Sequence, residues 1–141
     1  MSEPEWKAQT SLSAVFGRVL ALLRQEKGVS QREFRKLANM KPGAIERLET
    51  GLATASLPHL YKVSRGLRSD ERVSPKKPRP AVIDVGVDGL LRLVDDCARE
   101  LGERGFRVYM EGPAKDGQEE MDSARIDRVI GGVVEGWLEG R

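Results

Sequence analysis

The chain has 141 residues, of which 39% are apolar and 33% are charged, a composition typical of a soluble folded protein rather than a disordered one. No apolar run approaches the length of a membrane span, and the first residues lack the apolar stretch of a secretory signal. The single cysteine excludes an internal disulfide framework. We therefore expect a cytoplasmic protein with no membrane association.

Charge is distributed unevenly along the chain. Residues 1–68 hold 12 Lys and Arg against 6 Asp and Glu, a net charge of +6, whereas residues 69–141 hold 12 against 16, a net charge of −4. A basic half is typical of a surface that meets a polyanion such as nucleic acid. From the charges alone, an uneven distribution that arises by chance in a charge-rich chain explains the difference equally well.

Four helices are predicted in a first domain, residues 13–68, which follows an N-terminal tail, residues 1–12. Apolar residues in the first helix recur at three- to four-residue spacing, and Gly28 ends it. The second helix begins after Ser30, because Ser30 and Glu33 have the spacing of a capping box.

The third helix is predicted over residues 42–50. Pro42 suits the first position of a helix, because the backbone N–H group at that position has no partner within the helix and proline lacks this group. Gly51 follows the last turn. The fourth helix opens at Ser56. Its apolar stripe is expected to face inward and consists of Leu57, Leu60, Val63 and Leu67.

Residues 69–80 contain three prolines and predict an extended linker. The second unit, residues 81–141, is predicted to be a small α/β module. Its elements are a strand, a helix, a strand and a helix at residues 81–87, 88–102, 106–110 and 122–138, with a loop at 111–120. Such a unit buries little apolar surface alone, so we expect it to form a homodimer. The alternative is that it folds back on the first domain as one monomeric unit. The fold class is mainly α.

The motif residues follow a recognisable spacing. Ser30-Gln31 opens the second helix, and residues 45–51 carry Ile45, Arg47, Leu48, Glu49 and Gly51 in the order apolar, spacer, basic, apolar, Glu, spacer, Gly. These residues resemble the Xre/Cro-type helix-turn-helix family of phage-repressor-like regulators, over roughly two-fifths of the chain. The resemblance implies a lambda-repressor-like helical bundle that places its third helix in the major groove of duplex DNA.

The resemblance also implies roles for individual residues. Gln31 would hold a DNA phosphate, Arg24 and Glu49 would form a structural ion pair, and Thr50 would lie near the DNA backbone. The residues that we expect to contact DNA are Ser30, Gln31, Arg32, Arg35, Lys41, Gly43, Glu46, Arg47 and Thr50.

The expected recognition surface departs from the family pattern. Small polar residues are usual where this chain has Lys41, Pro42, Gly43 and Ala44. Base reading would then fall to Glu46 and Arg47, which can pair with cytosine and guanine respectively. Arg35 stands where the family commonly has alanine, so it must extend outward or push the two motif helices apart.

The sequence therefore predicts a sequence-specific DNA-binding transcriptional regulator, a dimeric repressor that dimerises through residues 81–141. The alternative is a helix-turn-helix scaffold that binds protein, like an antitoxin or a polymerase-associated factor, with weak or no DNA specificity. A phosphate loop, a metal-ligand cluster and a catalytic triad are not recognisable. We therefore expect no enzyme activity, catalytic residue, metal or cofactor. A pocket for a small effector at a dimer interface is an alternative that the sequence does not decide.

Overall fold

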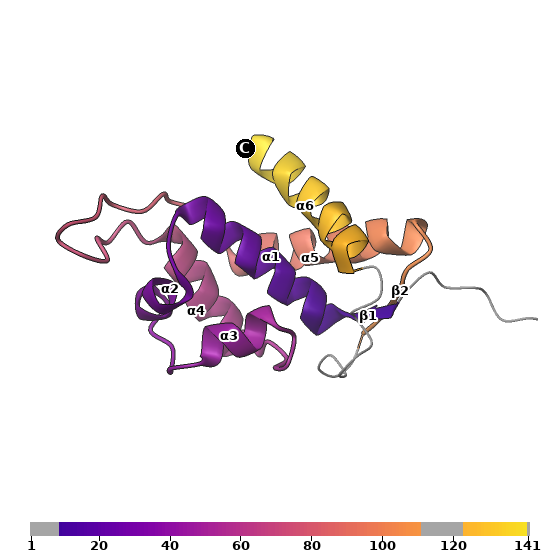
Figure 1. Cartoon of the computed structure of the whole chain (residues 1–141), viewed down its shortest axis with the longest axis horizontal. Helices are drawn as coiled ribbons and strands as arrows, with labels where there is room; N and C mark the ends of the chain where they lie inside the picture. The colour runs from indigo at the N-terminus through magenta and orange to yellow at the C-terminus, as the bar shows by residue number, and fades with distance from the viewer. Residues whose placement is uncertain (1–8, 111–122, 141) are drawn as a thin grey trace, which may run out of the picture.

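The computed structural model describes residues 9–110 and 123–140, which form six helices and two short strands (Figure 1). In chain order these are β1 (Gln9–Ser11), α1 (Leu12–Lys27), α2 (Gln31–Leu37), α3 (Ala44–Glu49), α4 (Leu57–Arg68), α5 (Val87–Glu103), β2 (Arg107–Tyr109) and α6 (Ser123–Glu139). The mainly helical character agrees with the prediction. Within these residues no helix is both long and apolar enough to cross a membrane.

Local signals set most helix boundaries in the N-terminal half. Gly28 ends α1 with φ of 83°, in the left-handed region that glycine tolerates. The predicted capping box of α2 is confirmed: Ser30 Oγ accepts from the Glu33 backbone N–H at 3.1 Å, and Glu33 Oε1 accepts from the Ser30 N–H at 2.9 Å. Ser56 caps α4 as predicted.

Two predictions in this half are wrong. Pro42 is not in the third helix, because Pro42 and Gly43 form a turn in which Gly43 has φ of 82°, and α3 begins only at Ala44. Leu57 does not face inward: it is the first residue of α4 and is 56% exposed. The rest of the predicted stripe is buried at Leu60, Val63 and Leu67.

The predicted strand at residues 81–87 is also wrong. Residues 81–86 do not form a strand, although their apolar residues do alternate, since Ile83 and Val85 are buried. Their polar backbone groups bond to α4 instead: the Ile83 N–H donates to Leu67 O at 2.9 Å, and Ser64 Oγ donates to Val85 O at 2.5 Å. The segment is therefore an extended strap along α4.

The structure also corrects the predicted N-terminal tail. Residues Gln9–Ser11 form β1, which pairs in parallel with β2 so that Thr10 lies opposite Val108. β2 is shorter than the predicted strand at 106–110. α5 begins at Val87, one residue before the predicted helix 88–102, and it ends one residue beyond it, at Glu103. The predicted loop at 111–120 lies outside the described residues.

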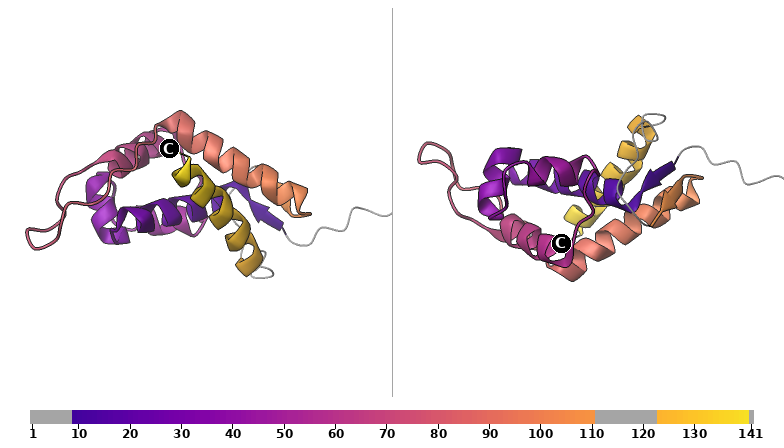
Figure 2. Two further views of the ribbon diagram at one scale, coloured as in Figure 1. Left: turned by 90° about the horizontal axis from the view of Figure 1, so that it is seen from above. Right: turned by 90° about the horizontal axis from the view of Figure 1, so that it is seen from below.

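The centre of the molecule is α1, which packs against α3, α4, α5 and α6. Buried apolar residues of both halves belong to one continuous core, which includes Val15, Val19, Leu93 and Ile130. In Figure 2, α5 and α6 lie beside α1, whereas the loop between α4 and α5 projects from the end of the molecule opposite the two strands. The C-terminal half is thus folded back on the N-terminal bundle.

Candidate nucleic-acid interface

The α2–α3 unit presents its outer face to solvent. Phe34, Ile45 and Leu48 are buried in the core, where α2 packs against α3 and α4, and α3 packs against α1. The opposite side of α3 is exposed at Glu46 and Arg47. α3 therefore lies on the surface as a short rod held from one side, which is the disposition needed to enter a groove.

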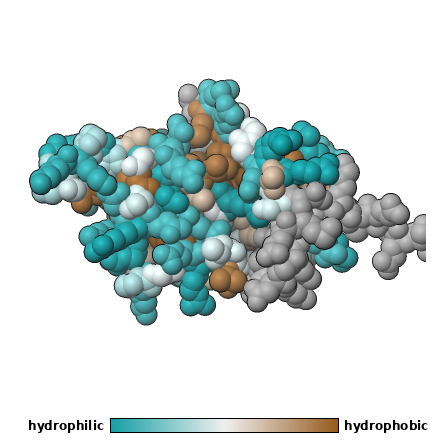
Figure 3. Space-filling model, viewed as in Figure 1, coloured by the Kyte–Doolittle hydropathy of each residue, from teal (hydrophilic) through white to brown (hydrophobic). Residues whose placement is uncertain are grey.

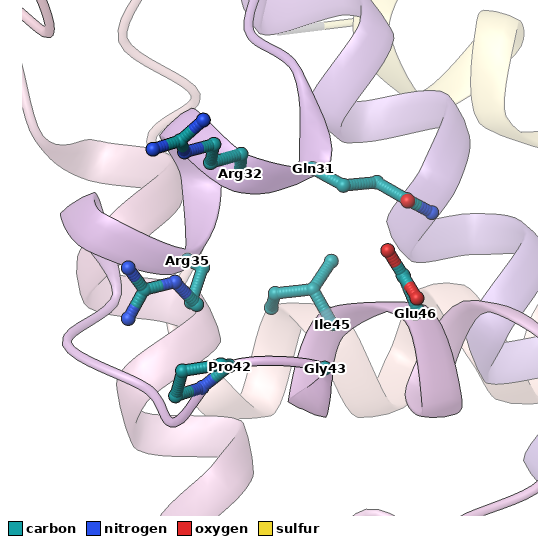
Figure 4. Close-up of a pocket in the computed structure, with 7 residues that line it drawn as sticks. All are labelled: Gln31, Arg32, Arg35, Pro42, Gly43, Ile45 and Glu46. Carbon is teal, nitrogen blue, oxygen red and sulfur yellow. The ribbon is translucent and has the colours of Figure 1, made fainter.

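A shallow depression of about 270 Å³ lies between the two motif helices (Figure 4). Arg32 and Arg35 of α2 stand on one side of it, Glu46 of α3 on the other, and Ile45 lies between them. The remaining lining residues are Gln31, Pro42 and Gly43. The depression is thus bordered by basic, acidic and amide groups, which suits polar contacts.

The ion pair expected between Arg24 and Glu49 is formed. Arg24 donates through Nε to Glu49 Oε2 at 2.7 Å and through Nη2 to Oε1 at 3.0 Å, and its Nη1 donates to Val29 O at 2.9 Å. The Glu49 side chain is only 6% exposed. This bidentate pair ties the end of α3 to α1 and to the chain that enters α2.

Gln31 belongs to the same network. Its Nε2 donates to Glu49 Oε1 at 2.9 Å, so one amide N–H already has an acceptor within the protein. A side-chain amide carries a second N–H, which is the one left for a phosphate. Gln31 therefore positions α3 as well as being a candidate DNA contact.

Arg35 does not push the motif helices apart. It extends along the turn, where its Nη1 donates to Met40 O at 3.0 Å, and it is half-buried. A guanidinium on this carbonyl stabilises the turn between α2 and α3, which includes Asn39 at φ of 54°. The sequence suggested a DNA contact at Arg35 but gave no sign of this role in the turn.

The other residues predicted to contact DNA fall into two groups: those whose side chains form a hydrogen bond within the protein, and those whose side chains form none within the described residues. The hydroxyl of Ser30 caps α2, and Thr50 Oγ1 donates to Glu46 O at 2.9 Å. Four charged side chains are exposed and have no hydrogen bond or ion pair within the described parts of the chain: Arg32, Lys41, Glu46 and Arg47. Gly43 lies exposed at the turn before α3, with nothing near the position of a β-carbon.

Sequence analysis missed an ion pair at the edge of α2. Lys77 Nζ donates to Glu33 Oε2 at 2.8 Å. This hydrogen bond, together with that from the Ser30 backbone, lowers the pKa of Glu33 to about 2. The capping box indicates a stabilised Glu33 carboxylate, but no local signal identifies a partner 44 residues away.

A buried lysine was missed as well. The Lys27 ammonium donates to Leu67 O at 2.9 Å, to Ser69 O at 2.5 Å and to Ala81 O at 2.5 Å, and the residue is 2% exposed. Burial lowers the pKa of Lys27, while the charge of Asp70 opposes that shift. This ammonium joins α1, the end of α4 and the start of the strap at one point.

Comparison with known proteins supports the structural reading. Residues 15–73 match the family model of a helix-turn-helix domain. No curated protein and no solved structure matched the chain. The matched segment spans nearly all of α1 to α4, so this part of the chain is a helix-turn-helix domain, a type of domain that suggests a DNA-binding regulator.

Proposed function

We propose that the protein is an Xre/Cro-type transcriptional regulator that binds duplex DNA in a sequence-specific manner, with α3 in the major groove. One observation carries the proposal: α3 is fixed from one side by α1 and α2, and Glu46 and Arg47 on its other side are exposed and unpaired within the described residues.

Base reading is assigned to Glu46 and Arg47. An α-helix with its side chains is about 10–12 Å in diameter, so α3 fits a major groove about 12 Å wide. Arg47 would donate two hydrogen bonds to guanine, and Glu46 would accept from the amino group of cytosine. The turn at Pro42 and Gly43 presents no side-chain donor, so it would contact the DNA by shape alone.

Phosphate contacts are assigned to the rim of the depression. Arg32, which lines the depression, and Lys41, which lies in the nearby turn between α2 and α3, are exposed cations, and Gln31 has one amide N–H to donate. Arg35 would contribute to DNA binding indirectly, by stabilising the turn between α2 and α3. Such contacts orient the protein on the duplex and carry no sequence information themselves.

We further propose that the protein binds as a homodimer and acts as a repressor. A groove between α1 and α6 is lined in part by Leu22, Val134 and Leu138, and apolar side chains reach the surface in this region (Figure 3). A two-fold axis through α6 would present two copies of α3 to two half-sites about one helical turn apart. Occupying a promoter in this way blocks polymerase without any further activity.

The experiment is selection of bound sequences from a random pool of duplex DNA, with purified full-length protein. The expected result is an enriched palindrome whose half-sites are centred about 10 base pairs apart. Arg47→Ala should lose the preference at one guanine, by about 1–3 kcal/mol, while an Arg92→Ala control on the exposed face of α5 keeps it.

Two outcomes would contradict the proposal. If Arg47→Ala selected the same sequence with the same preference as the unmodified protein, α3 would not be the reading element. If the protein retained no DNA even at low salt, the helix-turn-helix scaffold would serve protein binding instead, because phosphate contacts are strongest under that condition.

A further inference from the structure

The loop of residues 70–80 leaves the molecule and returns to the same point. Its two ends are held by one ammonium group, since Lys27 donates to the carbonyl groups of Ser69 and Ala81. A buried, desolvated lysine is costly unless it is fully hydrogen-bonded, and here three carbonyls satisfy it. A flexible linker needs no such clamp, so the base of this loop is fixed.

The loop is also attached to the helix-turn-helix motif. Lys77 pairs with Glu33, which stands next to Arg32 on α2. Three prolines, at positions 75, 78 and 80, restrict the backbone of the loop. In Figures 1 and 2 the loop projects past α2, away from α5 and α6. Because the loop is held at its base and at Lys77, it would lose less conformational entropy on binding a ligand than an unattached linker.

Some charged side chains of the loop have no ion-pair partner in the described parts of the protein. Residues 70–80 include four Lys and Arg against two Asp and Glu. Lys77 is paired with Glu33, and Arg79 lies 3.7 Å from Asp70. Arg72 and Lys76 are exposed and have no ion pair in the parts of the chain that the structure describes. These two cations are thus available to an anionic partner.

We infer that this loop is a second DNA-binding element, an arm that places Arg72 and Lys76 against the phosphates flanking the groove that α3 enters. The inference rests on the proposed function. The Lys77–Glu33 pair holds the arm against α2, which packs on α3, so the arm lies on the α2 side of the helix that enters the groove. The arm contacts phosphate only and adds affinity for every sequence.

The test compares salt dependence in two charge-matched variants. One is Arg72→Gln with Lys76→Gln; the control is Arg92→Gln with Arg107→Gln, two cations on α5 and β2 that are exposed and have no ion pair within the described residues. Binding of a labelled mixed-sequence duplex is measured by fluorescence anisotropy across a salt series. Each phosphate contact contributes about 0.9 to the slope of log Kobs against log salt concentration.

The arm variant should have a slope shallower by about 2, with weaker binding at low salt, whereas the control keeps the slope of the unmodified protein. An unchanged slope in the arm variant, with DNA bound normally, would overturn the inference and leave the proposed function standing. An equally reduced slope in both variants would mean that only the overall charge of the protein matters, and this result would also overturn the inference. Absence of DNA binding by the unmodified protein would reject both proposals together.

Discussion

Gly17 is a point of close approach between α1 and α3. A β-carbon built at this position would lie 2.6 Å from Glu49 O and 2.8 Å from Glu49 C, and closer still to Leu48 O. All three are backbone atoms at the end of α3, so no side-chain rotation can relieve the contact. Substitution by alanine must push α3 and α1 apart.

The size of the effect follows from two opposing terms. Alanine is favoured over glycine inside a helix by about 1 kcal/mol. Overpacking a close contact costs about 1–3 kcal/mol, and a clash with backbone belongs at the upper end. We therefore expect Gly17→Ala to lower the free energy of unfolding by about 2 kcal/mol. Gly132→Ala is the matched control, because Gly132 lies inside α6 with nothing within 4 Å of its β-carbon position.

Both variants are unfolded in urea and followed by far-ultraviolet circular dichroism. Gly132→Ala should be about 1 kcal/mol more stable than the unmodified protein, since it gains helix propensity alone. Gly17→Ala should be less stable, and the displaced α3 should also bind DNA more weakly. If Gly17→Ala were as stable as Gly132→Ala, the close packing of α1 on α3 described above would be refuted.

Three further predictions concern individual side chains. Glu49→Ala should lower the free energy of unfolding by about 3 kcal/mol, because it strands a largely buried guanidinium; Arg99→Ala, at an exposed pair, should change it by under about 1 kcal/mol in the same urea assay. The pKa of Glu33, lowered to about 2 from an ordinary 4.5, means that its contribution to stability is present above pH 4.5 and lost as the pH falls towards 2. An NMR titration should find the Glu33 pKa higher in Lys77→Met, and an unchanged value would exclude the ion pair. Burial raises the pKa of the Cys97 thiol to about 12, so thiol reagents should label it only on unfolding; rapid labelling of the native protein would contradict its burial.

Predictions from the sequence succeeded where the signal was local. The capping box at Ser30 is fixed by two side chains three residues apart, and the helix that follows begins where it predicts. The Arg24–Glu49 pair was found through the family resemblance, whose motif carries both residues. Glu46 and Arg47, the expected base-reading residues, are exposed, and their contact with bases stays a prediction.

Predictions failed where the decisive partner is distant or the backbone conformation is unusual. Alternation of apolar residues at 81–87 correctly indicates one buried face, but the hydrogen-bonding partner is α4 rather than a strand. β1 has three residues, too few for a periodic pattern, and its partner β2 lies almost a hundred residues later. The start of α3 was misplaced because the left-handed conformation of Gly43 lets Pro42 stay outside the helix.

The burial of α1 has a mechanical consequence. Five consecutive residues, 13–17, are buried, so this helix has no solvent-facing side near its start. α6 rests on one flank of α1 and α3 on another, with backbone touching backbone at Gly17. Close-packed protein interiors are barely compressible. A shift of α6, such as a second subunit would impose, is therefore transmitted to α3 through the thickness of a single helix.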